Sequence, residues 1–247
     1  MIVGKPVLIL QLRPEDETSD GEFKAILRYG NLNESNVHRI RIEKTGIPSI
    51  KLDNYCAVIV GGSPFDISTP DKAKSSIQKD IEHSFRLFFD EIVPRDFPFL
   101  GACSGNGLLG NYLGAEITGK YSEPVGGATV QLTAEGKQDP LLAGFPDKIR
   151  VLLGHKEACD QIPPGATLLI RGDVCAVQMF RCGKNVYATQ FHPEGDAKVF
   201  ETRINAYRNH GYFDSDQVEE LILAVKKEET PHANGILKRF VERYRDS

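Results

Sequence analysis

The chain has 247 residues, of which 40% are hydrophobic and 26% charged, a composition typical of a folded globular protein. Thirty lysines and arginines against thirty-four acidic residues leave a formal charge of -4, which argues against a dedicated nucleic-acid binder. No apolar run approaches the roughly 18 residues of a membrane-spanning helix, and the stretch 1–11 lacks the shape of a signal peptide. Five scattered cysteines without a CxxC pair argue against disulfides and zinc, so we expect a reduced, cytoplasmic protein with no metal or cofactor.

The N-terminal part of the chain predicts strands that alternate with helices. Residues 6–12, 55–60 and 97–102 are nearly continuous apolar runs, as in buried parallel strands, and residues 37–42 alternate in part, as in a more exposed strand. From residue 71 to 93 the apolar positions step by threes and fours, which predicts a helix that Pro94 ends. Two further helices are expected over 14–27 and 106–113.

Beyond residue 120 the pattern changes to short strands separated by glycine, proline and aspartate, and then to helices. We expect an α/β, flavodoxin-like fold, with a mostly parallel central sheet, helices on both faces and an antiparallel β extension. Residues 1–247 are interpreted as one domain with a C-terminal helical extension over about 197–247. The expected strands are 128–132, 149–153, 167–171, 174–180 and 185–191, and the expected helices 197–209, 215–228 and 234–245.

Residues 101–105 read Gly-Ala-Cys-Ser-Gly between a predicted strand and a predicted helix. A glycine-flanked nucleophile at such a junction is a nucleophile elbow, here with cysteine in place of serine. Small neighbours suit the strained turn, and the N-terminal N–H groups of the following helix favour a thiolate at Cys103. The alternative is a buried structural cysteine beside a glycine-rich turn.

A candidate base for this thiol follows the predicted strand 185–191, where the chain reads His192-Pro193-Glu194. In an extended chain, side chains two residues apart point to the same side, so Glu194 can accept a hydrogen bond from His192. The other ring nitrogen is then free to face a thiol, as a catalytic base requires. A surface loop that happens to contain a histidine and a glutamate is the alternative interpretation.

Adjacent glycines, Gly61 and Gly62, end the strand predicted over 55–60. Glycines at the carboxyl end of a parallel strand let the backbone approach a ligand closely. A backbone N–H of this turn, together with the N–H of Ser104, is a candidate oxyanion hole. An ordinary strand-to-helix turn is the alternative.

All three motifs lie at ends of predicted strands, the edge where open α/β sheets place their sites. With Leu108 and Leu109 after Gly-x-Cys-x-Gly and a distant His-Pro-Glu, the chain resembles the class I glutamine amidotransferases. The resemblance extends from Ile9 to about Asp196 and is to the stand-alone, GMP-synthase-like branch.

The resemblance implies a catalytic triad of Cys103, His192 and Glu194 that hydrolyses the side-chain amide of glutamine through a γ-glutamyl thioester and releases ammonia. It also implies that the amides of Gly62 and Ser104 form the oxyanion hole. No metal or organic cofactor is implied. Neither a nucleic acid nor a membrane is expected as a partner.

Two departures from the family pattern qualify these expectations. Many relatives carry Gly-His-Gln after the nucleophile, and that glutamine helps to hold the substrate, whereas here Gly107 supplies no side chain. The substrate is therefore glutamine or another γ-glutamyl amide, and a stand-alone γ-glutamyl amide or peptide hydrolase is the alternative function. There is no ATP-binding motif, so acceptor chemistry would belong to a separate synthetase subunit.

Two other acidic residues are weaker candidates. Glu157 replaces the acid of a His-x-Asp segment in relatives and receives no catalytic role, and Glu123 is a candidate for structuring the pocket. A non-enzymatic binding protein that keeps the fold is a third hypothesis, disfavoured because every triad position is filled.

Overall fold

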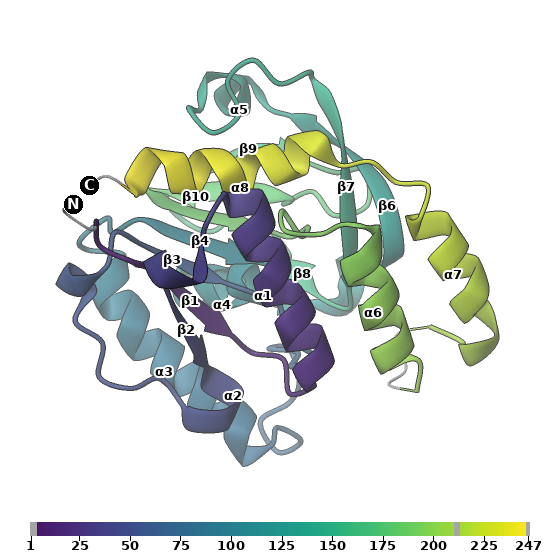
Figure 1. The fold of residues 1–247 in the computed structure, drawn as a ribbon, viewed down its shortest axis with the longest axis horizontal. Helices are drawn as coiled ribbons and strands as arrows, with labels where there is room; N and C mark the ends of the chain where they lie inside the picture. The colour runs from purple at the N-terminus through teal and green to yellow at the C-terminus, as the bar shows by residue number, and fades with distance from the viewer. Residues whose placement is uncertain (1–3, 210–212, 246–247) are drawn as a thin grey trace.

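The computed structural model describes residues 4–209 and 213–245, and a nine-stranded sheet forms its centre (Figure 1). The strand order is β2-β1-β3-β4-β11-β10-β9-β6-β7, and a two-stranded ribbon of β5 and β8 is separate. The strands are β1 Val7–Gln11, β2 Val37–Arg41, β3 Ala57–Val60, β4 Phe99–Ala102, β5 Ile117–Thr118, β6 Glu123–Leu132, β7 Lys148–His155, β8 Ala158–Cys159, β9 Ala166–Arg171, β10 Met179–Cys182 and β11 Val186–Thr189.

The direction of the strands divides the sheet into two parts. Strands β2, β1, β3, β4 and β11 run parallel, whereas β10, β9, β6 and β7 pair antiparallel. This confirms the expected parallel core with an antiparallel extension. The chain passes from β1 to β2 on one side and then to β3 on the other, so the strand order reverses beside β1. Ligand sites of open α/β sheets lie outside the carboxyl ends of the strands at such a reversal.

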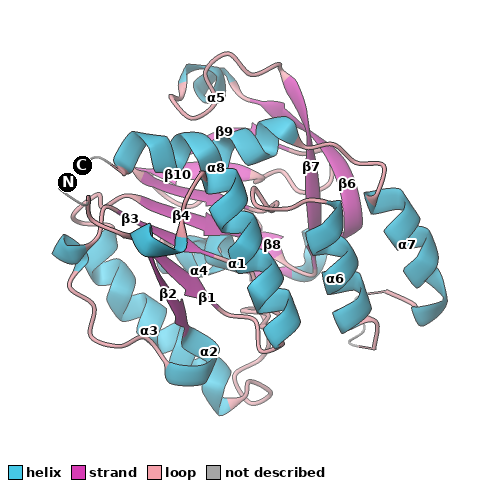
Figure 2. Ribbon diagram, in the orientation of Figure 1, coloured by secondary structure: helices cyan, strands magenta, loops and turns pink. Residues whose placement is uncertain are grey.

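Helices cover both faces of the sheet because every residue of the central strands is buried and neighbouring side chains point to opposite faces (Figure 2). Val7 and Ile9 of β1 pack with apolar residues of α1 and α8, whereas Leu8 and Leu10 pack with those of α3 and α4. The helices are α1 Asp16–Gly30, α2 Ile42–Thr45, α3 Ser76–Ile92, α4 Ser104–Tyr112, α5 Ala134–Gln138, α6 Ala197–Tyr207, α7 Val218–Val225 and α8 Pro231–Tyr244.

Helices α6 and α7 form a third apolar cluster with Leu152 of β7, and α6 also contacts α1. These contacts bring residues after 196 close to the N-terminal part of the chain. None of the helices in the described ranges combines the length with the apolar composition that a membrane crossing requires.

Several element boundaries differ from the sequence prediction. The strand expected over 174–180 is mostly a loop, because a bond from the Gly172 N–H to the Cys175 carbonyl (3.0 Å) makes a turn and β10 begins only at Met179. Strand β6 begins at Glu123 instead of 128. Pro124 and two glycines are untypical of a strand, so the sequence pattern did not predict its first residues, and its register shifts there. The helix expected over 215–228 is a short 3-10 turn followed by α7, and α3 starts at residue 76. Positions 210–212 and 246–247 of the expected C-terminal extension lie outside the described residues.

Candidate active site

Four turns at the carboxyl edge of the parallel strands meet beside one cysteine. They carry Arg13 after β1, Gly62 after β3, Cys103 after β4, and His192 with Glu194 after β11. Cys103 and His192, which are far apart in the sequence, line one cavity together with Arg13. The sheet topology therefore brings the residues singled out by sequence to a single place.

The backbone of Cys103 is strained. It has φ 52° and ψ -97°, a conformation that residues with a Cβ rarely adopt, immediately before the first residue of α4. The flanking glycines make the turn possible, because a Cβ on Gly101 would lie 2.7 Å from the backbone carbon of Gly105. This geometry is that of the nucleophile elbow.

The surroundings of the thiol favour its neutral form. Burial raises the pKa of Cys103 to about 12, although the positive charges of Arg13 and Arg203 act in the opposite direction. Loss of solvent therefore acts against the thiolate that the helix N-terminus is expected to favour.

His192 and Glu194 form a buried pair. Nδ1 of His192 lies 2.8 Å from Oε1 of Glu194, and both side chains are almost fully buried. An ionised Glu194 accepts only, so Nδ1 carries the proton and Nε2 presents its lone pair. Burial, followed by the charge of Arg203, lowers the pKa of His192. Burial acts to raise the pKa of Glu194, but His192 and Arg203 prevail and hold it below its ordinary value.

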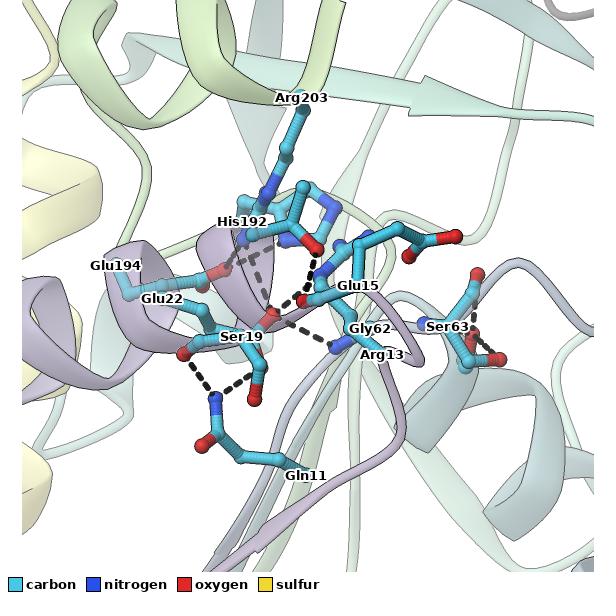
Figure 3. Close-up of polar contacts among 12 residues, drawn as sticks. Gln11, Arg13, Glu15, Ser19, Glu22, Gly62, Ser63, His192, Glu194 and Arg203 are labelled. Atoms are coloured by element: carbon cyan, nitrogen blue, oxygen red, sulfur yellow. Dashed lines mark hydrogen bonds and ion pairs between the residues drawn. The ribbon is translucent and has the colours of Figure 1, made fainter. Parts of the chain in front are cut away.

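A buried network of charges extends behind this pair (Figure 3). Arg203 donates from Nη2 to Oε1 of Glu194 (2.8 Å) and to Oε2 of Glu22 (3.1 Å). Oε2 of Glu22 also accepts from Nε of Arg13 (2.8 Å), and its Oε1 accepts from Nε2 of Gln11 (3.0 Å).

Sequence reasoning missed this network, although the sequence carried a signal of it. Arg203 lies within the apolar stripe of α6 between Phe200 and Ile204, and Glu22 lies beside Phe23 on the buried face of α1. A charged residue inside an apolar helical stripe indicates a buried ionic partner, because an unpaired charge is costly to bury.

The proposed oxyanion donors are placed differently from one another. Ser104 is the first residue of α4, where backbone N–H groups lack partners within the helix. The N–H of Gly62, by contrast, points to Oε2 of Glu22 at 3.3 Å. A Cβ on Gly62 would lie 2.8 Å from Cε1 of His192 and 2.6 Å from Nη2 of Arg13, so only glycine fits there.

Two cavities adjoin Cys103, and both include Ser63 and Gly154. The one we call the acyl cleft extends over Ser104, and the one we call the imidazole-side cavity extends past His192. The acyl cleft is lined further by Asp66, Lys156, Glu157 and Gln190. The imidazole-side cavity is lined further by Arg13, Val125, Phe200, Arg203, Ile204, Tyr207 and Phe213.

Gly107 lies in the wall of the acyl cleft. A Cβ at this position would lie 2.9 Å from Cδ1 of Ile67, so Ile67 fills the space that a larger residue would need. Glu157 fixes the neighbouring loop, because its carboxylate accepts the N–H groups of Ile67 and Ser68, each at 2.7 Å. Polar side chains from other segments, among them Asp66 and Lys156, line the same cleft.

A second cluster of chemistry-bearing residues consists of Glu123, His155 and Cys175, whose ligand atoms lie within 4.8 Å of one another. These atom types suit zinc. Hydrogen bonds already join the group, however: Oε2 of Glu123 lies 3.0 Å from Nε2 of His155 and accepts from Nε2 of Gln178 at 2.6 Å. Glu123 thus ties β6 to β7 beside the acyl cleft, of which His155 is a wall.

Comparison with known proteins places most of the chain in one family. The family model for Glutamine amidotransferase class-I matches residues 19–209. A subunit of the glutamine-hydrolyzing GMP synthase from Methanoregula boonei is 26% identical over 187 residues, which are 73% of this chain and 90% of the relative. The corresponding GMP synthase subunit from Halobacterium salinarum is 32% identical over 106 residues, 42% of this chain and just over half (56%) of the relative.

Solved structures show the same fold over nearly the whole chain. A glutamine amidotransferase from Thermotoga maritima superposes with a TM-score of 0.72 at 26% identity, covering 98% of this chain and 99% of the other. The protein SMU.1228c has a TM-score of 0.73 at 20% identity, covering 96% of this chain and 98% of the other, which supports the fold alone.

Proposed function

Because the chain belongs to the class I glutamine amidotransferases, we propose that it hydrolyses the side-chain amide of glutamine on Cys103 and releases ammonia for a transfer reaction. One observation carries this proposal. A cysteine in a strained turn at a helix N-terminus shares a cavity with a histidine whose Nδ1 is held by a buried carboxylate at 2.8 Å. This is the arrangement of nucleophile, base and orienting group that acyl transfer requires.

In the proposed reaction the thiol of Cys103 gives its proton to Nε2 of His192 as the sulfur attacks the γ-carbonyl carbon. The carbon–nitrogen bond then breaks, His192 returns the proton to the leaving ammonia, and a γ-glutamyl thioester remains. A water then gives a proton to His192 as its oxygen attacks the thioester carbon. The carbon–sulfur bond breaks, glutamate is released, and His192 returns the proton to the sulfur of Cys103. Glu194 keeps its charge throughout and stabilises the imidazolium.

The proposed oxyanion hole combines the N–H groups of Gly62 and Ser104. The N–H of Ser104 is at the helix start, whereas that of Gly62 has to turn from Glu22 toward the substrate oxygen. Since catalytic hydrogen bonds often form only in the substrate complex, this resting geometry is compatible with the role.

We propose further that the acceptor of the ammonia is bound by a separate synthetase subunit. The GMP synthase relatives support this, because their names describe one subunit of a glutamine-hydrolysing synthetase.

The central test is the Cys103→Ala variant. We expect it to abolish ammonia release from glutamine while its thermal unfolding remains close to that of the wild type, because only the nucleophile is lost. Ammonia release by purified protein, with circular dichroism as the folding control, measures both. Glutamine turnover that persists in Cys103→Ala would reject the proposal.

A second function, hydrolysis of larger γ-glutamyl amides without a synthetase, is favoured by the imidazole-side cavity. Its apolar residues Val125, Phe200 and Ile204 lie on the side of His192, where the leaving group departs, and would accept a substituent on the amide nitrogen. Parallel assays with glutamine and γ-glutamyl anilide separate the two functions. Faster turnover of the anilide would favour the second, and faster turnover of glutamine the first.

A further inference from the structure

The buried charges behind the triad are joined by a single nitrogen. Nη2 of Arg203 donates to Glu194 and to Glu22, and all three side chains are at most 7% exposed. Within the described part of the chain, Nε and Nη1 of Arg203 have no hydrogen-bond partner. Because such a buried ionic group contributes little net stability and leaves donors unsatisfied, stability alone does not explain its presence.

The charges of the network sum to zero only when His192 is neutral. Arg13 and Arg203 contribute two positive charges, and Glu22 and Glu194 contribute two negative ones. With a neutral His192 the buried group is neutral, whereas protonation of the ring adds one uncompensated positive charge. The network therefore favours the neutral imidazole, the form that can accept the thiol proton.

We propose that Arg203 and Glu22 are positioning residues for glutamine hydrolysis, which hold the Glu194 carboxylate against Nδ1 of His192 and set the charge around the ring. Arg203 acts through its contact with Glu194 and through its charge, Glu22 acts through Arg203, and neither takes part in bond making. The inference rests on the proposed roles of Cys103 and His192 as nucleophile and base.

Besides Tyr207 of α6, which lines the same cavity, the charged and titratable groups around His192 come from five segments of the chain. They are Cys103 from the turn between β4 and α4, Arg13 from the segment after β1, Glu22 from α1 through Arg203, Arg203 from α6, and Glu194 from its own turn. Figure 3 shows Glu22, Glu194 and Arg203 gathered on one side of the His192 ring.

Two near-isosteric substitutions should shift the pKa of His192 in opposite directions. Arg203→Met removes a positive charge, so we expect the pKa of His192 to rise by about one unit, a shift typical of a close charge. Glu22→Gln keeps the shape and one acceptor oxygen but removes a negative charge, so the pKa of His192 should fall. The acid limb of the kcat/KM profile for glutamine should move with it, because the base must be unprotonated.

The experiment combines NMR titration of labelled His192 with kcat/KM profiles of the full chain. Arg203→Lys keeps the charge, and we expect its acid limb to stay at the wild-type pH. Arg181→Met is the matched control, since it breaks a partly buried ion pair, with Asp139 at 3.1 Å, outside the site, and should leave the pKa of His192 unchanged.

Opposite shifts in Arg203→Met and Glu22→Gln support the proposal, and an unchanged pKa of His192 in both, or shifts of the same sign, overturn it. If Arg203→Met fails to fold, Glu22→Gln decides alone, because an unchanged pKa there contradicts the charge argument. The titration needs no turnover. A wild type without glutaminase activity would therefore reject the proposed function while the role of the network is still measured.

Discussion

At Cys103 the backbone and the side chain have different physical requirements. The turn tolerates a Cβ at positive φ only because Gly101 and Gly105 lie in contact beneath it. The thiol lines two cavities, and burial raises its pKa. In the proposed reaction, a neutral thiol gives its proton to His192 as the sulfur attacks the substrate.

In the proposed reaction, the ring of His192 is the group on which the rate depends most after the nucleophile. We expect His192→Ala to lower kcat for glutamine by roughly 10²–10⁴-fold, the usual contribution of a general base. Steady-state ammonia release measures this loss. His38→Ala is the control, because His38 lies on β2 with its ring stacked on Tyr55 at 5.7 Å. A rate for His192→Ala within a few fold of the control would show that the ring is not the base.

At the scale of elements, α3 and α6 use their buried faces differently. Helix α3 buries one stripe of aromatic and aliphatic residues against the sheet and leaves the other face in solvent. Helix α6 uses its buried stripe for packing and for the site together, since Arg203 lies among apolar residues of the same stripe. A charged residue at the site, Arg203, is thus supplied by a helix far along the chain from the first strands.

Substitutions on the buried and the exposed face of α3 should have different effects on the free energy of unfolding. Phe85 is 1% exposed and its ring centre lies 5.6 Å from that of Phe89, so we expect Phe85→Ala to lower the free energy of unfolding by about 3–5 kcal/mol. Leu87 is 57% exposed, and Leu87→Ala should change the free energy of unfolding by less than about 0.5 kcal/mol. Urea unfolding of both variants checks this, and equal losses would contradict the helix orientation.

At the scale of the whole molecule, the buried thiols make the free energy of unfolding depend on pH in the alkaline range. Burial raises the pKa values of Cys103, Cys159 and Cys175 from 9.0 to about 12. Between these pH values the unfolded chain has lost thiol protons that the native state retains. The stabilising contribution of these groups is therefore complete below pH 9 and is lost as the pH rises toward 12.

We accordingly expect the free energy of unfolding to fall above pH 9, by up to about 1.4 kcal/mol per pH unit for each such thiol. Cys159→Ala should have a shallower decline than the wild type. Urea unfolding at pH 8, 9 and 10 measures the slopes, and Leu87→Ala, which keeps every thiol, should retain the wild-type slope. Identical slopes in Cys159→Ala and the wild type would refute the linkage.

The family and the parallel core were within reach of the sequence, because buried strands, glycine turns and helical stripes are local patterns. The strand over 123–127 was not, since Pro124 and the glycines oppose strand propensity and only pairing with β7 specifies it. For the same reason the loop before Met179 was taken for a strand.

The sequence by itself determined the strand-end motifs around Cys103 and His192 and the class of reaction they suit. Only the tertiary structure decided the burial that raises the pKa of the thiol, the contact of the Gly62 N–H with Glu22, and the support of Glu194 by Arg203. Local patterns specify local geometry, whereas burial and charge pairing depend on residues up to 181 positions apart that folding brings together.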